Sequence, residues 1–248
     1  MCSAARTSIV KKRLDVLLVE RGLAETRSQA QALVLAGRVP GHTKAGEQVD
    51  DAAELEVEAG PRFASRGGEK LAQALAELEI DVSGEDCLDV GASTGGFTDC
   101  LLQAGAARVI ALDVGYGQLH PRLRSDPRVT VLERKNVREL DCGELPFRPS
   151  FVTADVSFIS LAKALPPALE CAADGWRALV LVKPQFEAGR ADVRKGGVVR
   201  DPEVRRRVLD EVSAQVPEWG GRLEGVVESG LPGPKGNREF FLYLAAAE

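Results

Sequence analysis

The alternation of short apolar runs with helical stretches constrains the fold of this chain more than any other feature. From Ser65 to the C-terminus, seven runs rich in aliphatic and aromatic residues are separated by longer stretches, and these runs are 87–90, 108–114, 129–132, 151–156, 178–183, 223–227 and 238–244. Strands that alternate with helices form a mostly parallel sheet whose two faces the helices cover. We therefore predict a doubly wound, Rossmann-like α/β domain of seven strands, with a hairpin-like pair at the end.

A different pattern precedes this domain. The stretch "RLDVLLVERGL" (13–23) has a helical period and Gly22 at its expected end. Thr26 begins a second helix, with Gln29 as its capping-box partner and Gly37 as its stop. The following residues alternate Gly, Pro, Val and Leu, which indicates small strands and turns. We predict a small α+β domain over residues 1–60, a linker over 61–68 and the large domain over 69–248.

The charges of the chain are unevenly distributed. The net charge is −5, but residues 1–43 hold seven Lys and Arg against three acids, and residues 190–207 hold seven against three. Residues 44–60 reverse the sign, with one lysine against six acids. Local patches decide where a polyanion docks. The candidate nucleic-acid contacts are Lys11, Lys12, Arg13, Arg21, Arg27, Arg38, Arg62 and Arg66. A solvated basic face on an ordinary helical hairpin is the alternative.

The composition argues against several classes of protein. Five scattered cysteines without a C-x-x-C pair, beside only two histidines, indicate neither a zinc site nor a disulfide framework. We expect reduced, structural thiols and no metal. Apolar runs fall far short of the roughly 20 residues that cross a bilayer. The basic start of the chain leads into no clean apolar core of a secretory signal. We therefore expect a cytoplasmic protein; the sequence does not fix its oligomeric state.

The loop "LDVGASTGGFTD" (88–99) follows a predicted strand and precedes a predicted helix, the context in which glycines indicate ligand binding. Gly91 and Gly95 allow the backbone to approach a ligand closely. Ser93 stands where a dinucleotide fingerprint has its middle glycine, and Asp89 would repel a pyrophosphate. A cationic or zwitterionic ligand fits better, with the Asp89 carboxylate near its ammonium group.

Asp113, at the end of the next predicted strand, is placed to accept hydrogen bonds from ribose hydroxyls. S-adenosylmethionine (SAM) has both an ammonium group and a ribose diol, and we expect it as the cofactor. A nicotinamide dinucleotide and a purely structural turn are the alternatives. The expected cofactor-binding residues are Asp89, Gly91, Ala92, Ser93, Thr94, Gly95, Gly96, Phe97 and Asp113.

An acid and a lysine end two further strands. Asp155 follows the fourth predicted strand and Lys183 ends the fifth, so both would project into one crevice at the carboxyl edge of the sheet. A surface salt bridge is the alternative interpretation of this pair.

Longer motifs resemble known families. Residues 12–59 are similar to the S4 RNA-binding domain, although the hairpin after Val39 is shortened to "VPGHTKAG". The large domain contains "SRGGEKL" (65–71), "ALDVGYGQL" (111–119), "DPRVTVLERKNVR" (126–138), "ADVSFISL" (154–161), "LVKPQFEAG" (181–189), "GGVVRDP" (196–202) and "GPKGNREFFL" (233–242). In order and spacing these motifs resemble the TlyA family. Its members are labelled haemolysins but are similar to FtsJ-like, SAM-dependent ribose 2′-O-methyltransferases.

The resemblance implies a catalytic set of Lys70, Asp155, Lys183 and Glu239. A ribose 2′-hydroxyl is a weak nucleophile, so the protein must orient it and remove its proton. Lys183 is our candidate for the base. A free lysine has a pKa of about 10.4, so it serves as a base only where its surroundings lower that value. The resemblance also places Asn136, Asp113 and Asp155 near the cofactor, and Ser157 and Phe158 near the target nucleotide.

The same resemblance implies the substrate, a cytidine ribose in the ribosomal RNA of ribosomal subunits. Forms that act on both subunits tend to continue with a helix beyond the last strand, whereas this chain stops four residues after Leu244. We therefore expect 23S rRNA as the main target, with 16S rRNA as a further one. Three alternatives remain: a membrane-active haemolysin, a catalytically inactive RNA-binding protein, and a methyltransferase of small molecules.

Overall fold

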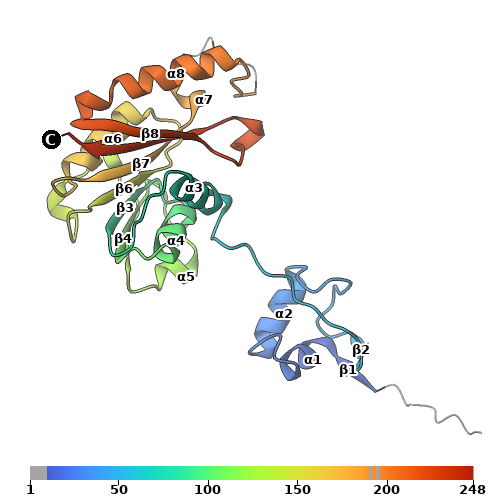
Figure 1. Cartoon of the computed structure of the whole chain (residues 1–248). Coiled ribbons are helices and arrows are strands. Elements are labelled where there is room, and N and C mark those ends of the chain that lie inside the picture. The colour runs from blue at the N-terminus through green and yellow to red at the C-terminus, as the bar shows by residue number, and fades with distance from the viewer. Residues whose placement is uncertain (1–9, 190–191, 194–195, 248) are drawn as a thin grey trace, which may run out of the picture. The chain divides into compact units, whose positions relative to one another are not determined.

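The computed structural model describes residues 10–189, 192–193 and 196–247, and the chain divides into two compact units, Met1–Arg62 and Phe63–Glu248 (Figure 1). Each unit has its own buried core. Cys2 and residues 190–191 and 194–195 of the predicted basic stretch lie outside the described residues.

The small unit packs two helices against a short two-stranded sheet. Its elements are β1 (Lys11–Arg13), α1 (Leu14–Glu20), α2 (Arg27–Leu35) and β2 (Gln48–Asp50), with β1 antiparallel to β2. Leu14, Leu18, Ala30 and Val34 form the centre of its core. The predicted cap of α2 is confirmed, because the Thr26 side chain accepts a hydrogen bond from the Gln29 N–H at 3.2 Å.

The large unit contains the predicted seven-stranded, mostly parallel sheet. Its strands are β3 (Asp86–Val90), β4 (Arg108–Leu112), β5 (Val129–Leu132), β6 (Phe151–Ala154), β7 (Arg177–Val182), β8 (Gly221–Glu228) and β9 (Phe240–Ala246), in the spatial order β5-β4-β3-β6-β7-β9-β8. The first five run parallel, and β9 is antiparallel to both β7 and β8. Strand β3 has β4 on one side and β6 on the other, so the strand order reverses there. Ligands of doubly wound sheets bind at this point.

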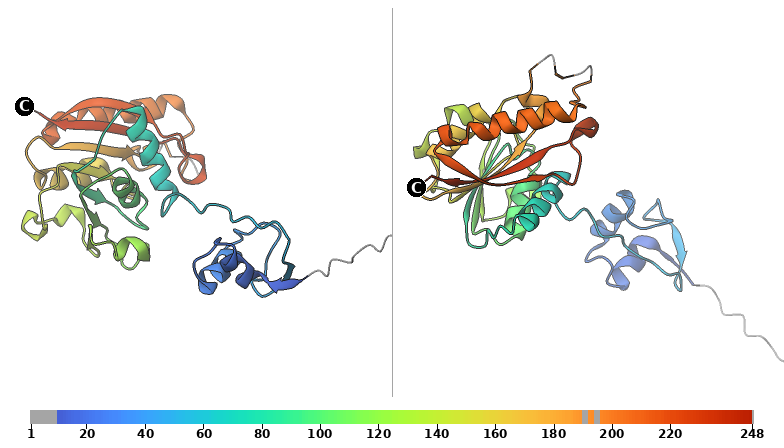
Figure 2. Two further views of the ribbon diagram at one scale, coloured as in Figure 1. Left: turned by 60° about the horizontal axis from the view of Figure 1, so that its bottom comes forward. Right: turned by 45° about the horizontal axis from the view of Figure 1, so that its top comes forward.

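Helices cover both faces of the sheet (Figures 1 and 2). One face packs against α3 (Arg66–Glu77), α4 (Gly96–Gln103) and the short α5 (Pro121–Arg124), through a core that contains Leu71, Leu101 and Phe241. The other face packs against α6 (Leu161–Glu170) and α8 (Pro202–Ala214), through Leu165 and Val208. The remaining elements are α7 (Pro184–Glu187) and four single turns: η1 (Val137–Glu139), η2 (Cys142–Glu144), η3 (Val216–Trp219) and η4 (Pro234–Gly236).

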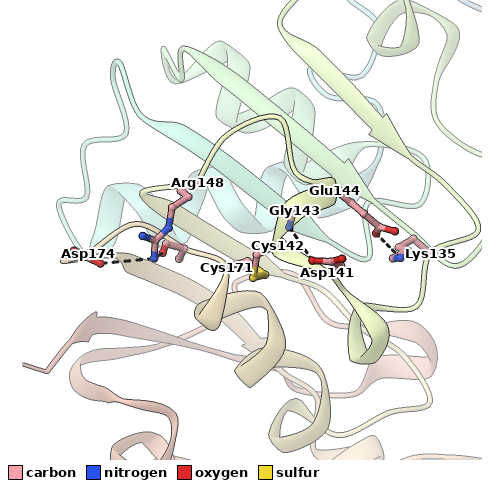
Figure 3. Close-up of a disulfide and its surroundings, with 9 residues drawn as sticks. Lys135, Asp141, Cys142, Gly143, Glu144, Arg148, Cys171 and Asp174 are labelled. Carbon is pink, nitrogen blue, oxygen red and sulfur yellow. Dashed lines mark hydrogen bonds and ion pairs between the residues drawn. A yellow bond between two sulfur atoms is a disulfide. The ribbon is translucent and has the colours of Figure 1, made fainter.

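The expectation that all cysteines are reduced is wrong for one pair. Cys142 and Cys171 form a disulfide with their Cα atoms 4.9 Å apart, although 29 positions separate them in the sequence (Figure 3). The fold brings them together because Cys142 lies in η2, ahead of β6, and Cys171 caps the end of α6. Cys87 and Cys100 are buried thiols outside this disulfide, as predicted.

Salt bridges lie on both sides of this disulfide. Lys135 pairs with Glu144, and Arg148 pairs with Asp174 at 3.7 Å (Figure 3). The segment between β5 and β6 is therefore attached to its surroundings by both covalent and ionic contacts. None of the described helices is long and apolar enough to cross a membrane.

We expect the substitution Cys142→Ser to lower the stability of the protein. A cross-link across this separation contributes at most about 3 to 4 kcal/mol by constraining the unfolded chain. Cys142 is exposed, so serine fits its place without burying a new polar group. The midpoint of thermal unfolding should be lower for the variant than for wild type. Dithiothreitol should lower the midpoint of wild type and leave that of the variant unchanged. An unchanged wild-type midpoint on reduction would contradict the prediction.

Candidate active site

The predicted cofactor loop turns sharply after β3, and its glycines are required by close contacts. Gly91 has a φ of +83°, and a Cβ atom there would lie 2.5 Å from the carbonyl oxygen of Asp155. Gly95 has a φ of +93°, and its Cβ would lie 2.3 Å from a methyl group of Leu123. The Gly91 and Ala92 amides both donate to the carbonyl oxygen of Leu112. Side chains are therefore excluded where the loop meets its neighbours.

Asp89 lies beneath this loop and lines neither of the two cavities described below. Its carboxylate is fully buried and accepts hydrogen bonds from the Thr98 N–H at 2.9 Å, the Thr98 hydroxyl at 2.7 Å and the Thr153 hydroxyl at 3.2 Å. Burial raises the pKa of Asp89 to about 7. The Asp89 carboxylate thus ties the start of α4 to β3 and β6, and its contact with an ammonium group stays a prediction.

A cleft of about 920 Å³ lies at the carboxyl edge of β3, β4 and β6. Its walls include these predicted residues: Gly91, Ser93, Asp113, Asn136, Asp155, Ser157 and Phe158. A smaller cavity of about 300 Å³ shares Gly91, Ser93 and Asp155 with it. The predicted Ala92, Thr94, Gly96 and Phe97 line this second cavity. The two cavities are therefore two parts of one site.

Asp113 and Asn136 are held in the cleft by backbone hydrogen bonds. The Asp113 carboxylate accepts from the Ser93 N–H at 2.8 Å and from the Gly115 N–H at 2.6 Å. The side-chain oxygen of Asn136 accepts from the Arg138 N–H at 3.2 Å, at the start of η1. Each carboxylate oxygen has two acceptor sites, so Asp113 retains capacity for two ribose hydroxyls. The glycine cradle and this carboxylate both fit SAM.

The four predicted catalytic side chains converge on the smaller cavity from separate elements: Lys70 from α3, Asp155 after β6, Lys183 after β7 and Glu239 before β9. They form two ion pairs. The Lys70 Nζ lies 2.6 Å from the Glu239 Oε2, and Lys183 pairs with Asp155. Lys70, Lys183 and Glu239 are all buried, which requires such pairing because unpaired charges are costly away from water.

Neighbouring groups hold these pairs in place. The Lys183 Nζ also donates to the Ser157 hydroxyl at 3.1 Å, and the Gln185 amide donates to Glu239 at 3.1 Å. Phe158 is 92% exposed and has a φ of +65°. The site therefore combines a charged, enclosed part with an exposed aromatic ring at its rim.

Sequence reasoning missed two residues that support the site through hydrogen bonds, Gln185 and Glu187. Both lie on α7, within a motif that drew attention only to its lysine. Glu187 accepts a hydrogen bond from the Leu161 N–H at 2.8 Å, and burial raises its pKa. No local pattern identifies them, because their partners, Glu239 and the Leu161 N–H, follow only from the fold.

The basic residues of the small unit interact largely with their own chain. Arg13 and Arg27 both bind the buried carboxylate of Asp15, at 2.9 and 3.1 Å. The Arg13 guanidinium holds the pKa of Asp15 well below its usual range. Lys12 pairs with Glu20 at 2.7 Å and with Asp51 at 3.3 Å.

The two other arginines of this set bind backbone carbonyls. Arg21 donates to the oxygens of Asp51 and Ala53, and Arg38 donates to the oxygen of Glu58. Lys11 is exposed at the edge of β1. Two further arginines lie within the predicted linker, 61–68. Arg62 is exposed, whereas Arg66 begins α3 and lines the smaller cavity.

Comparison with known proteins decides the family. Residues 63–246 match the model of the FtsJ-like methyltransferase family, and residues 12–39 match the S4 domain. The chain belongs to the FtsJ-like methyltransferase family. Its fold, a mostly parallel seven-stranded sheet with an S4 domain at the N-terminus, agrees with that assignment.

Relatives of this FtsJ-like methyltransferase match nearly its full length. The 16S/23S rRNA (cytidine-2′-O)-methyltransferase TlyA of Mycobacterium tuberculosis is 48% identical over 241 residues, covering 94% of this chain and 90% of that protein. The putative rRNA methyltransferase YqxC of Bacillus subtilis is 47% identical, covering 94% and 85%. A solved structure of a putative hemolysin from Streptococcus thermophilus superposes with a TM-score of 0.74 at 42% identity, covering 97% and 90%.

Asp89 predicts a specific pH dependence of stability. Its raised folded-state pKa means that the folded protein binds the Asp89 proton more tightly than the unfolded chain does. The resulting contribution to the free energy of unfolding is therefore complete below about pH 4 and is lost as the pH rises to about 7. Three pKa units correspond to about 4 kcal/mol. As the pH rises from 4 to 7, the free energy of unfolding of wild type should therefore fall relative to that of Asp89→Asn.

The measurement is denaturant unfolding at a series of pH values between 4 and 7. Asp210→Asn, at an exposed position on α8, controls for the loss of one carboxyl group. A constant difference between Asp89→Asn and wild type across the window would refute the assignment.

Proposed function

We propose that this chain transfers a methyl group from SAM to the 2′-hydroxyl of a cytidine ribose in ribosomal RNA. The observation that carries the proposal is the convergence of two lysines and two carboxylates on a cavity that shares Asp155 with the larger cleft. The name of the 48% identical relative from M. tuberculosis supports the substrate. Its 16S/23S designation makes the ribosomal RNA of both subunits a candidate substrate.

SAM supplies a methyl group that is already activated on a positive sulfonium. The residues of the chain have two tasks, to orient the ribose hydroxyl and to accept its proton. We assign the cleft with Asp113 and Asn136 to the nucleoside part of SAM. The glycine loop lies between this cleft and the charged cavity, where the methyl group must be presented.

Lys183 is the proposed base. Its Nζ atom is held between Asp155 and the Ser157 hydroxyl at the junction of the two cavities. Asp155 orients the Lys183 amine. The positive sulfonium of bound SAM, placed beside this amine, would favour loss of its ammonium proton. Lys70 and Glu239 line the same smaller cavity, and their ion pair balances its charge. The exposed Phe158 ring is suited to stack against an extruded target base.

The basic face of the small unit and Arg62 are proposed to dock the ribosomal RNA. Phosphate contacts of lysines and arginines position a protein without reading sequence. A membrane-active haemolysin has less support, since no described helix is able to span a bilayer and the charged cavity has no role there. A small-molecule methyltransferase would leave the S4 domain without a function.

Lys183→Arg tests the proposed base. Arginine retains the positive charge but does not lose a proton at working pH. We expect SAM binding and subunit binding to persist, and the single-turnover rate to fall about 100-fold or more, as is typical when general-base catalysis is lost. The wild-type rate should rise with pH between 6 and 9, and the residual rate of the variant should not. Robust transfer by the variant would end the assignment.

Removing residues 1–62 tests the docking role of the small unit. The large unit has its own core, so the truncated protein should fold and bind SAM in calorimetry. Transfer of tritiated methyl groups to intact subunits should be lost, because docking contacts with phosphates are removed. Mapping of the modified ribose on 23S and 16S rRNA identifies the target of the full chain. Full activity of the truncated protein on subunits would disprove the docking role.

A further inference from the structure

The segment 183–187, which contains α7, contacts the loop 155–160 and the first residue of α6 at three points. The Lys183 Nζ, just before α7, donates to the Ser157 hydroxyl at 3.1 Å. The Phe186 ring lies 5.1 Å from the Phe158 ring, measured between centroids. The Glu187 Oε1 accepts from the Leu161 N–H at 2.8 Å. One short segment thus contacts the middle of this loop and the start of the helix that follows it.

The loop 155–160 needs such support. Phe158 has a φ of +65°, a left-handed conformation that is costly for a bulky residue and persists only where the surroundings hold it. The loop runs directly into α6, whose N-cap residue, Ser160, makes no side-chain hydrogen bond to the first turn. The initial amides of a helix need partners from outside it. Glu187 provides one for Leu161.

Glu187 itself lines neither part of the site, whereas Phe186 and the residues of the loop do. Its side chain is only partly exposed, and its carboxylate faces the N-terminus of α6, where the helix dipole favours negative charge. The hydrogen bond to the Leu161 N–H therefore connects Glu187 to the loop that lines the site.

We propose that Glu187 is a positioning residue for methyl transfer. Its carboxylate fixes the first amide of α6, and this sets where Ser157 meets Lys183 and where the Phe158 ring faces the incoming nucleotide. The inference rests on the proposed function, because it names a further residue of that site. It predicts a loss in the transfer step and not in cofactor binding, since the hydrogen bonds that hold Asp113 come from the Ser93 and Gly115 amides and do not involve Glu187.

The test compares Glu187→Ala with Glu187→Gln in the full chain, at a temperature where thermal unfolding shows every variant to be folded. Glutamine keeps an oxygen that accepts from Leu161. The single-turnover rate on ribosomal subunits should fall at least about tenfold in the Ala variant, because small misplacements of reacting groups are costly. The Gln variant should stay within about threefold of wild type, and SAM affinity within about twofold in both. Glu170→Ala, at the exposed far end of α6, is the matched control.

Hydrogen exchange gives a readout that is independent of activity. Amides of residues 157–163 should exchange faster in Glu187→Ala and return towards wild type in Glu187→Gln. An Ala variant with the wild-type rate, a Gln variant as slow as Ala, or a parallel loss of SAM affinity would each overturn the proposal.

If Glu187→Ala does not fold, Glu187→Asp replaces it, because its shorter side chain keeps the charge but does not reach Leu161. A rate equal to wild type in the Asp variant would overturn the proposal, and a fall of at least about tenfold would support it. A wild-type protein that methylates no RNA refutes the proposed function, and the role of Glu187 falls with it. If only the proposed role of Glu187 is wrong, wild type methylates RNA and Glu187→Ala does so at the same rate.

Discussion

The backbone contact between Gly91 and Asp155 is the constraint on which the rest of the site depends. A Cβ atom at Gly91 would lie 2.5 Å from the Asp155 carbonyl oxygen, and the Asp155 N–H donates to the carbonyl oxygen of Val90 at 2.9 Å. The ends of β3 and β6 are thus held together without any intervening side chain. Asp155 lines both cavities. The contact between the Gly91 and Asp155 backbones therefore fixes how far the cofactor loop lies from the four catalytic candidates.

Charge pairing links the remaining elements to this contact. Lys183 joins β7 to Asp155, and Lys70 joins α3 to Glu239 ahead of β9, although 169 positions separate the last two residues. Removing one partner of a buried pair leaves the other charge uncompensated, which is far more costly than losing a surface salt bridge. The same four side chains therefore hold the carboxyl edge of the sheet together and supply the chemistry proposed for it.

Local sequence patterns were sufficient for the parts of the molecule that local physics decides. Apolar runs located all seven strands, and the Thr26 cap and the glycines of the loop followed from backbone requirements. Resemblance to a family, and not periodicity, identified Lys70 and Glu239. The interaction partners of individual side chains could not be predicted from the sequence, because they depend on the tertiary structure. Asp89 is buried under the loop, and Cys142 meets Cys171 only after α6 returns the chain.

The acidic partners of the small unit affect how it meets a polyanion. Lys12, Arg13 and Arg27 already have carboxylates beside them, so binding a phosphate there exchanges one ionic contact for another. The electrostatic part of nucleic-acid binding comes from the release of condensed counterions and scales with the phosphates neutralised. A basic face that is partly neutralised from within releases fewer of them. The affinity of the small unit for RNA should therefore fall with ionic strength less steeply than its number of lysines and arginines implies. The shape of the RNA should then contribute a larger share of the recognition.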